Sequence, residues 1–176
     1  EKAMMDALKI DPLDKDAQGA CESDIRYVSH EVSYSGNGLL TVHVSTEWDG
    51  GAHPENSSEY ANFVIADGRA LGGADIFAPG TEAKVKALMI ADMQANPGED
   101  FDAETVKDQI DTFNEHFTDE TKVDHLMVGI TEKGLVIDMG NSYPHVILAL
   151  APVTTIKWAD AKPLLLAGTP AAALAK

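Results

Sequence analysis

Alternating apolar and polar positions dominate two stretches early in the chain. Residues 24–34 and 39–48 alternate in this way and are rich in β-branched and aromatic side chains. Because side chains repeat every two residues along a strand, one face of the second stretch would carry Val42, Val44, Thr46 and Trp48. The linking residues Ser35-Gly36-Asn37-Gly38 tolerate positive φ and predict a hairpin turn. A third strand is predicted over residues 58–66.

The middle of the chain has helical periodicity. Residues 81–96 predict a helix with Thr81 as its N-cap. Its apolar stripe consists of Val85, Leu88, Met89 and Met93. Residues 102–117 repeat apolar side chains at helical spacing after the predicted N-cap Asp102, namely Val106, Ile110, Phe113 and Phe117. Asn96-Pro97-Gly98 separates these two predicted helices.

Strand patterns return after the helices, over 123–131, 135–139, 144–151 and 153–158, and residues 159–166 predict a last helical turn or two. Hairpin-length links favour antiparallel pairing. We therefore predict an α+β fold, one antiparallel sheet with two central helices packed on one face. The predicted organisation is an N-terminal extension (1–22), a single domain (23–167) and an Ala-rich tail (168–176) that frays.

The net charge of the chain limits the classes of partner that it can bind. The chain of 176 residues has 13 Lys and Arg against 29 Asp and Glu, a formal net charge of −16. Such a surface repels nucleic acid and anionic lipid and attracts cationic proteins, cationic ligands or metal ions. The alternative is an acidic face that only keeps a structural protein soluble.

The sequence says less about compartment. No apolar run reaches about 18 residues, so no segment of this chain is predicted to span a bilayer. The chain begins at Glu1, and we expect that a leader or anchor has been removed. The single cysteine, Cys21, cannot form an internal disulfide and does not decide the compartment.

No catalytic or metal motif can be read from the residues. None of the six histidines lies in an HExxH, HxH or CxxC context, and no GxSxG is present. The Gly-rich segment 49–54 contains His53, which could bind a ligand or metal with Asp49 or Glu55, or could only hydrogen-bond the loop backbone. Gly50-Gly51 does not match a phosphate-binding loop, and backbone freedom is its simpler role.

Two groups of motifs carry a resemblance to a known family. The first comprises Trp48-Asp49-Gly50-Gly51-Ala52-His53-Pro54, Tyr60-Ala61-Asn62-Phe63, Gly68-Arg69-Ala70-Leu71 and Ala74-Asp75-Ile76-Phe77-Ala78-Pro79-Gly80. The second comprises Ile130-Thr131-Glu132-Lys133-Gly134-Leu135-Val136, Thr155-Ile156-Lys157-Trp158-Ala159-Asp160 and Pro163-Leu164-Leu165. Over residues 25–167 the chain resembles the C-terminal extracytoplasmic domain of RsiV-type, lysozyme-sensing anti-sigma factors. A similar domain of unknown function lies beside the catalytic domain of PdaC-type peptidoglycan deacetylases.

The resemblance implies an exported cell-envelope binding or sensory domain, in the periplasm or at the cell surface, with no catalysis, cofactor or metal of its own. It implies lysozyme, a cationic protein, or peptidoglycan fragments as partners. The ligand-binding residues we expect are Trp48, Asp49, Gly50, Gly51, His53 and Tyr143. The family's tyrosine-, glutamate- and proline-rich stretch is matched only by Tyr143 and Pro144. The alternative function is a cell-wall hydrolase or deacetylase with a metal near His53.

Overall fold

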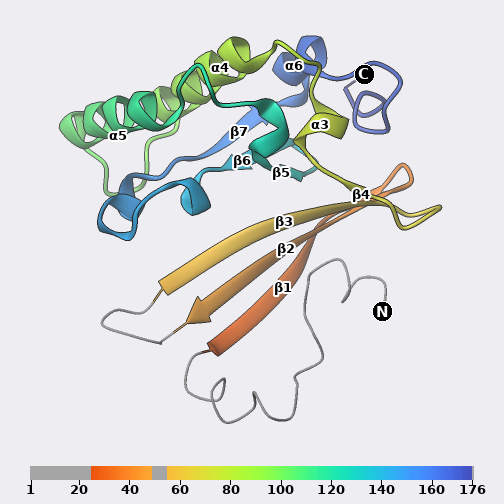
Figure 1. Cartoon of the computed structure of the whole chain (residues 1–176), viewed down its shortest axis with the longest axis horizontal. Coiled ribbons are helices and arrows are strands. Elements are labelled where there is room, and N and C mark those ends of the chain that lie inside the picture. Colours follow the sequence, from red (N-terminus) through yellow and green to blue (C-terminus); the bar gives the residue numbers. More distant parts are fainter. Residues whose placement is uncertain (1–24, 49–54, 176) are drawn as a thin grey trace.

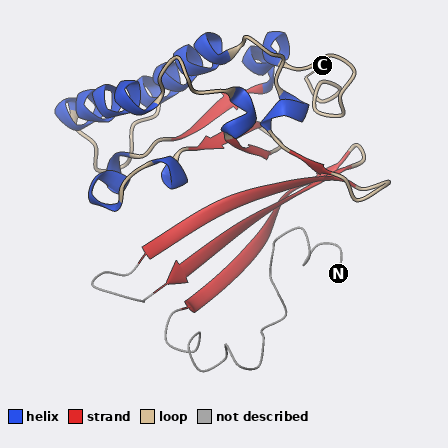
Figure 2. Ribbon diagram, in the orientation of Figure 1, coloured by secondary structure: helices blue, strands red, loops and turns tan. Residues whose placement is uncertain are grey.

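The computed structural model describes residues 25–48 and 55–175 and confirms the α+β class (Figures 1 and 2). Three layers follow one another: helices, a three-stranded sheet and a four-stranded sheet. The predicted single sheet is wrong, because the strands before the helices and those after them pair separately, in the orders β1-β2-β3-β4 and β5-β6-β7.

The first sheet contains the long strands β1 (Ile25–Gly36), β2 (Leu39–Trp48) and β3 (Glu55–Val64) and the short β4 (Ala70–Leu71). All neighbouring strands are antiparallel. The turn between β1 and β2 contains Asn37 at φ 50° and Gly38 at φ 77°. Two consecutive positive φ values are typical of the tight turns that connect twisted strands, so the predicted hairpin is confirmed.

The helical layer lies on the second sheet. It contains α3 (Gly73–Ile76), α4 (Glu82–Ala95) and α5 (Ala103–His116). Asp102 caps α5 as predicted, accepting a hydrogen bond from the Thr105 backbone N–H at 2.8 Å. Thr81 stands at the N-cap position of α4, but its hydroxyl donates to the Ala78 carbonyl instead. The predicted apolar stripes meet in the core, where Val85, Met89 and Phe113 are fully buried.

The second sheet contains β5 (Met127–Ile130), β6 (Gly134–Asp138) and β7 (Val153–Lys157). The predicted strand over 144–151 is wrong. These residues form the 3-10 helix η3 (His145–Leu150), because β7 occupies the place beside β6 and the residues before it serve as the connection. Other short helices are η1 (Val123–His125), η2 (Gly140–Ser142), α6 (Trp158–Ala161) and η4 (Lys162–Leu164).

The C-terminal residues belong to the core. Ala171 is fully buried and Ala175 is 3% exposed, and both pack in the main apolar cluster. The expectation that this Ala-rich tail frays is therefore wrong up to residue 175. Alanine has little apolar surface, but it fits where the chain passes close to other elements, and composition alone does not reveal such a site.

One side chain, Asn62 of β3, joins the two sheets. It is 2% exposed, and its amide nitrogen donates to the Val128 carbonyl of β5 at 2.6 Å. Its amide oxygen accepts from the Ile130 N–H at 3.1 Å and from the Thr41 hydroxyl at 2.9 Å. Val128 and Ile130 flank Gly129, so the amide takes the place that a neighbouring strand would occupy on β5. The sheets meet through a side chain, and β3 stays in its own ladder.

Gly129 allows this close approach. A Cβ atom there would lie 2.2 Å from the ring of Tyr60, which stands two residues before Asn62 on the same face of β3. The Tyr60 ring is stacked on His43 of β2 with 4.5 Å between ring centroids. The ring is therefore held from the other side, and only glycine fits at position 129.

Replacing Asn62 should weaken the whole fold. Asn62→Ala leaves the Val128 carbonyl, the Ile130 N–H and the Thr41 hydroxyl without this partner, and each buried unpaired group costs about 1–3 kcal/mol. We expect a loss of at least about 3 kcal/mol in the free energy of unfolding, measured by urea denaturation. Asn114→Ala, an exposed change on α5, is the control and should stay within about 0.5 kcal/mol. Equal losses of unfolding free energy for the two variants would contradict the role of Asn62 as the junction between the sheets.

Gly129→Ala should cost about 1–3 kcal/mol by overpacking against Tyr60. Gly72→Ala is the matched control, because a Cβ there meets nothing within 4 Å, and it should cost less than about 1 kcal/mol. Thermal unfolding in the Tyr60→Ala background tests the cause. If Gly129→Ala is equally costly without the ring, the clash is not the reason.

Candidate functional site

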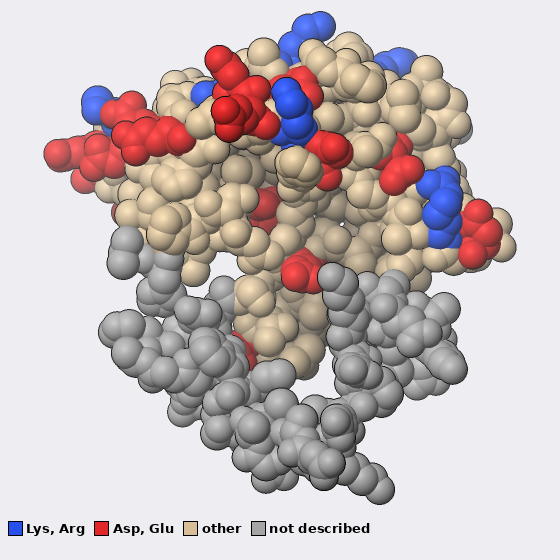
Figure 3. All heavy atoms as spheres, viewed as in Figure 1, with Lys and Arg blue, Asp and Glu red and all other residues tan. Residues whose placement is uncertain are grey.

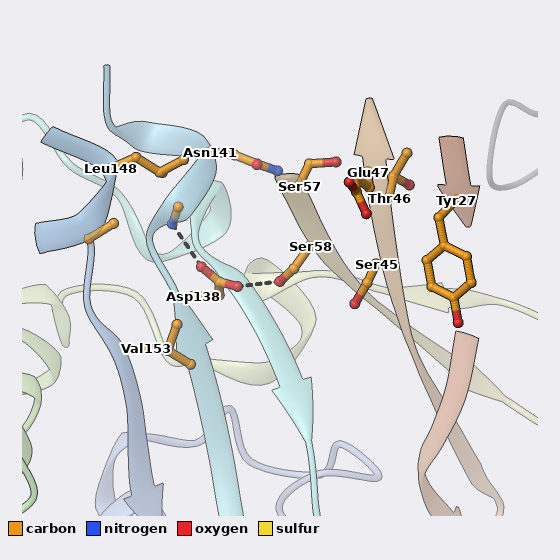
Figure 4. Close-up of a pocket in the computed structure, with 12 residues that line it drawn as sticks. Tyr27, Ser45, Thr46, Glu47, Ser57, Ser58, Asp138, Asn141, Leu148 and Val153 are labelled. Carbon is orange, nitrogen blue, oxygen red and sulfur yellow. Dashed lines mark hydrogen bonds between the residues drawn. The ribbon is translucent and has the colours of Figure 1, made fainter. Parts of the chain in front are cut away.

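The two sheets diverge away from the Asn62 junction (Figure 1). A cleft of about 380 Å³ lies between them (Figure 4). We call it the inter-sheet cleft. Strands β1, β2 and β3 line one wall, and β6, η2, η3 and β7 line the other. The lining residues are Tyr27, Ser45, Thr46, Glu47, Ser57, Ser58, Asp138, Gly140, Asn141, Leu148, Ala151 and Val153.

Strand alternation explains the polar wall. The face of β3 that carries Asn62 and Tyr60 also carries Ser58, which pairs with Ser45 of the neighbouring strand β2. Glu47 follows two residues after Ser45 and pairs with Tyr27 of β1. This face of the first sheet thus carries polar or hydroxyl-bearing side chains from Ser58 to Asn62 on β3. It is buried where β5 covers it and accessible where the second sheet turns away.

Asp138 lies at the base of the cleft, at the end of β6. Its side chain accepts hydrogen bonds from the Gly140 N–H at 2.7 Å and from the Ser58 hydroxyl (Figure 4). Ser58 and Asp138 are 80 positions apart, so only the folded chain brings them together. The residue is 9% exposed, and its two hydrogen bonds fix the carboxylate at one place in the cleft.

Part of the opposite wall is apolar. Leu148 of η3, Ala151, and Val153 of β7 line this part, and Figure 4 shows Leu148 and Val153 across the cleft from Tyr27. Val153 is 61% exposed and Tyr27 is 59% exposed. Two large apolar side chains thus remain accessible on either side of the opening.

The electrostatics of this region are negative. Burial raises the pKa of the Tyr60 hydroxyl, and the negative charges of Asp138 and Glu31 raise it further. Glu31 lies 3.4 Å from Nδ1 of His43, the residue stacked on Tyr60. No residue in the described lining of the cleft is Lys or Arg, and no ion pair to Asp138 occurs between described residues.

Most of the predicted site lies outside the described residues. This holds for Asp49, Gly50, Gly51 and His53, while Trp48 is the last residue of β2 and pairs with Glu55. Trp48 directly follows Glu47, a lining residue, so β2 ends beside the cleft. Their ligand-binding role stays a prediction.

Tyr143 is placed in the core. It is 7% exposed and stacks on His116 of α5 with 4.4 Å between ring centroids. Its hydroxyl is buried without a hydrogen-bond partner among the described residues. Burial alone raises its pKa from the ordinary value of 10.0 to about 12. Its predicted ligand-binding role is untested, and its ring is largely withdrawn from the surface.

Sequence reasoning missed Asp138 and Ser58. Alternate positions of two predicted strands carry hydroxyl groups, at Ser45 in one strand and at Ser58 and Tyr60 in the next. This pattern indicates a strand face that is not entirely part of an apolar core. It does not reveal the opposite wall, because Asp138 ends an apolar strand and its partner is distant in sequence.

Within residues 25–48 and 55–175, no group of three or more His, Cys, Asp or Glu side chains is arranged to hold a metal ion. In the same part of the chain, no helix has both the length and the apolar character needed to cross a bilayer.

Acidic side chains gather over the helical layer. Figure 3 shows them most densely at the upper left, where α5 lies in Figure 1. Helix α5 exposes Glu104, Asp108, Asp111 and Glu115. Between described residues, Lys or Arg pairs with a carboxylate at Arg69–Asp75 and Lys107–Asp111. Most of the described surface carboxylates are therefore not neutralised by an ion pair.

Two solved structures share this fold. A DUF3298 family protein of Pseudomonas aeruginosa PAO1 superposes with a TM-score of 0.54 at 20% identity, over 80% of this chain and 62% of that one. A DUF3298 family member from Bacteroides fragilis NCTC 9343 gives a TM-score of 0.59 at 15% identity, over 85% and 56%. This chain thus spans about three fifths of their lengths. DUF3298 is a domain of unknown function, so the similarity defines the fold.

No protein-family model and no curated protein matches the sequence. The RsiV-type resemblance is therefore supported only to the level of the fold.

Tyr143 gives a test that is independent of any ligand. Its folded pKa of about 12 exceeds the ordinary 10.0, so the unfolded chain releases this proton first and stability falls as pH rises from about 10 to about 12. Tyr143→Phe should weaken that dependence and remove a late step in the ultraviolet titration of tyrosinate. At neutral pH the variant should be no less stable, because the lost hydroxyl is unpaired. Marked destabilisation at neutral pH would contradict this placement.

Proposed function

We propose that this chain is a non-catalytic, exported cell-envelope domain that senses or binds a cationic protein, with lysozyme as the first candidate. The observation that carries the proposal is the uncompensated negative charge, 29 acidic against 13 basic residues. Opposite charges accelerate encounter and favour one orientation of the partners. The fold shared with DUF3298 proteins and the motif resemblance to lysozyme-sensing anti-sigma domains support the same assignment.

The cleft supports binding over a purely structural role. A monomeric protein gains no stability from leaving Tyr27 and Val153 exposed around a polar hollow. Concave sites with a few fixed polar groups and apolar walls are typical of ligand binding. Peptidoglycan fragments are the second partner class, which the hydroxyl groups of Ser45 and Ser58 could contact.

Salt dependence tests the proposal. Purified lysozyme should bind the chain in isothermal titration calorimetry at about 0.01 M salt and bind at least about tenfold more weakly at about 0.15 M, because screening shortens from about 30 Å to about 8 Å.

Cytochrome c, a basic protein of unrelated fold, is the control for unspecific attraction and should bind more weakly than lysozyme at both salt concentrations. If lysozyme binds at neither salt concentration, it is not the partner. A soluble muropeptide that binds without salt dependence would favour the peptidoglycan version instead.

A further inference from the structure

The inter-sheet cleft holds a carboxylate, that of Asp138, which two uncharged hydrogen-bond donors keep in position. Asp138 is 9% exposed, and its hydrogen bonds come from a backbone N–H and a serine hydroxyl, both uncharged. Among the residues whose side chains the structure describes, no Lys or Arg pairs with it. Removing a carboxylate from water without an opposite charge is unfavourable, and a cation delivered into the cleft would offset that penalty.

The remainder of the lining selects the kind of cation. Leu148, Ala151 and Val153 form an apolar wall that leads towards Asp138. A metal ion or a small ammonium ion would gain nothing from this wall. Lys and Arg side chains combine an apolar stem with a charged head, so the stem can lie on the wall while the head reaches the carboxylate. The exposed Tyr27 ring offers a cation–π face at the opening.

The cleft is large enough to admit a Lys or Arg side chain. Its volume of about 380 Å³ lies within the range for pockets that hold small ligands, about 300–1,000 Å³, so size alone does not select the occupant. A glycan would also meet serine hydroxyls and the Tyr27 ring, but it would leave the charge of Asp138 uncompensated. Charge complementarity therefore favours a cationic side chain.

We infer that the inter-sheet cleft receives a Lys or Arg side chain projecting from the cationic protein partner, with its head at Asp138 and Glu47 and its stem along Leu148 and Val153. This inference rests on the proposed function, since it assigns the binding site for that partner. It places the decisive contact between the sheets, whereas the exposed carboxylates of α5 act only at long range.

A charge-matched pair of variants separates these two surfaces. Asp138→Asn and Asp108→Asn each remove one negative charge, the first in the cleft and the second on the exposed face of α5. Asp138→Asn should weaken lysozyme binding by about tenfold or more, as loss of one partner of a buried pair does. Asp108→Asn should change it by less than about twofold, as for a rim charge. The reverse order would overturn the inference.

A second pair keeps the test decisive if Asp138→Asn does not fold. Val153→Arg places a guanidinium on the exposed wall, where it can occupy the cleft, and Val153 is 61% exposed, so the fold should tolerate it. Ile65→Arg makes the same charge change at a residue that is 57% exposed. Ile65 follows the opposite end of β3, roughly 20 Å from Ser58 at about 3.3 Å per residue. Only Val153→Arg should abolish binding, and equal effects would contradict the site.

A small probe separates failure of the site from failure of the function. If lysozyme does not bind the unaltered chain, the proposed function loses its first candidate, and the cleft is tested with N-acetyl-arginine methylamide. NMR titration should shift the amides of Ser58, Gly140 and Val153, and Asp138→Asn should abolish these shifts. The uncharged citrulline analogue should leave them unchanged. Shifts confined to α5, equal shifts with citrulline, or no shifts would overturn the inference.

Discussion

The Asn62 side chain determines how this molecule is assembled. A buried amide has two donors and two acceptor positions, and in this fold they connect β2, β3 and β5. The same amide also lies 3.4 Å from the Leu71 carbonyl of β4. Because the amide takes the place of a strand on the free edge of β5, the Val128 carbonyl and the Ile130 N–H on that edge are satisfied without main-chain pairing. The two sheets can therefore touch at one end and separate at the other.

The inter-sheet cleft follows from that geometry. Along one face of β3, the side chains in sequence are Ser58, Tyr60 and Asn62, and each contacts a different part of the second sheet: Asp138, Gly129, and Val128 with Ile130. The sheets pack directly against each other at Asn62 and Gly129. Towards Ser58 the separation grows until one hydroxyl–carboxylate contact remains beside open space. The fold thus presents a carboxylate that is largely shielded from solvent, where charge interactions are stronger than at an open surface.

Local patterns predicted much of the secondary structure. The glycine-containing turn at 35–38 and the apolar stripes ending in Met93 and Phe117 depend on neighbours three to seven residues away, and they appear as expected. The strand expected at 144–151 failed because an apolar run does not say whether a place in a sheet is vacant. The candidate site was not predicted either. The expected site around His53 lies outside the described residues, and nothing in the sequence around Asp138 indicated the cleft.

Residue types and short-range spacing were enough to predict the α+β class, the two central helices, the hairpins and the excess negative charge. The folded chain was needed to show that the strands form two sheets and that Ser58 meets Asp138. It was also needed to show that Gly129 receives the Tyr60 ring and that the alanines near the C-terminus are buried. These features depend on contacts between residues far apart in the chain, whose partners are chosen by packing and by the need to pair every buried polar group.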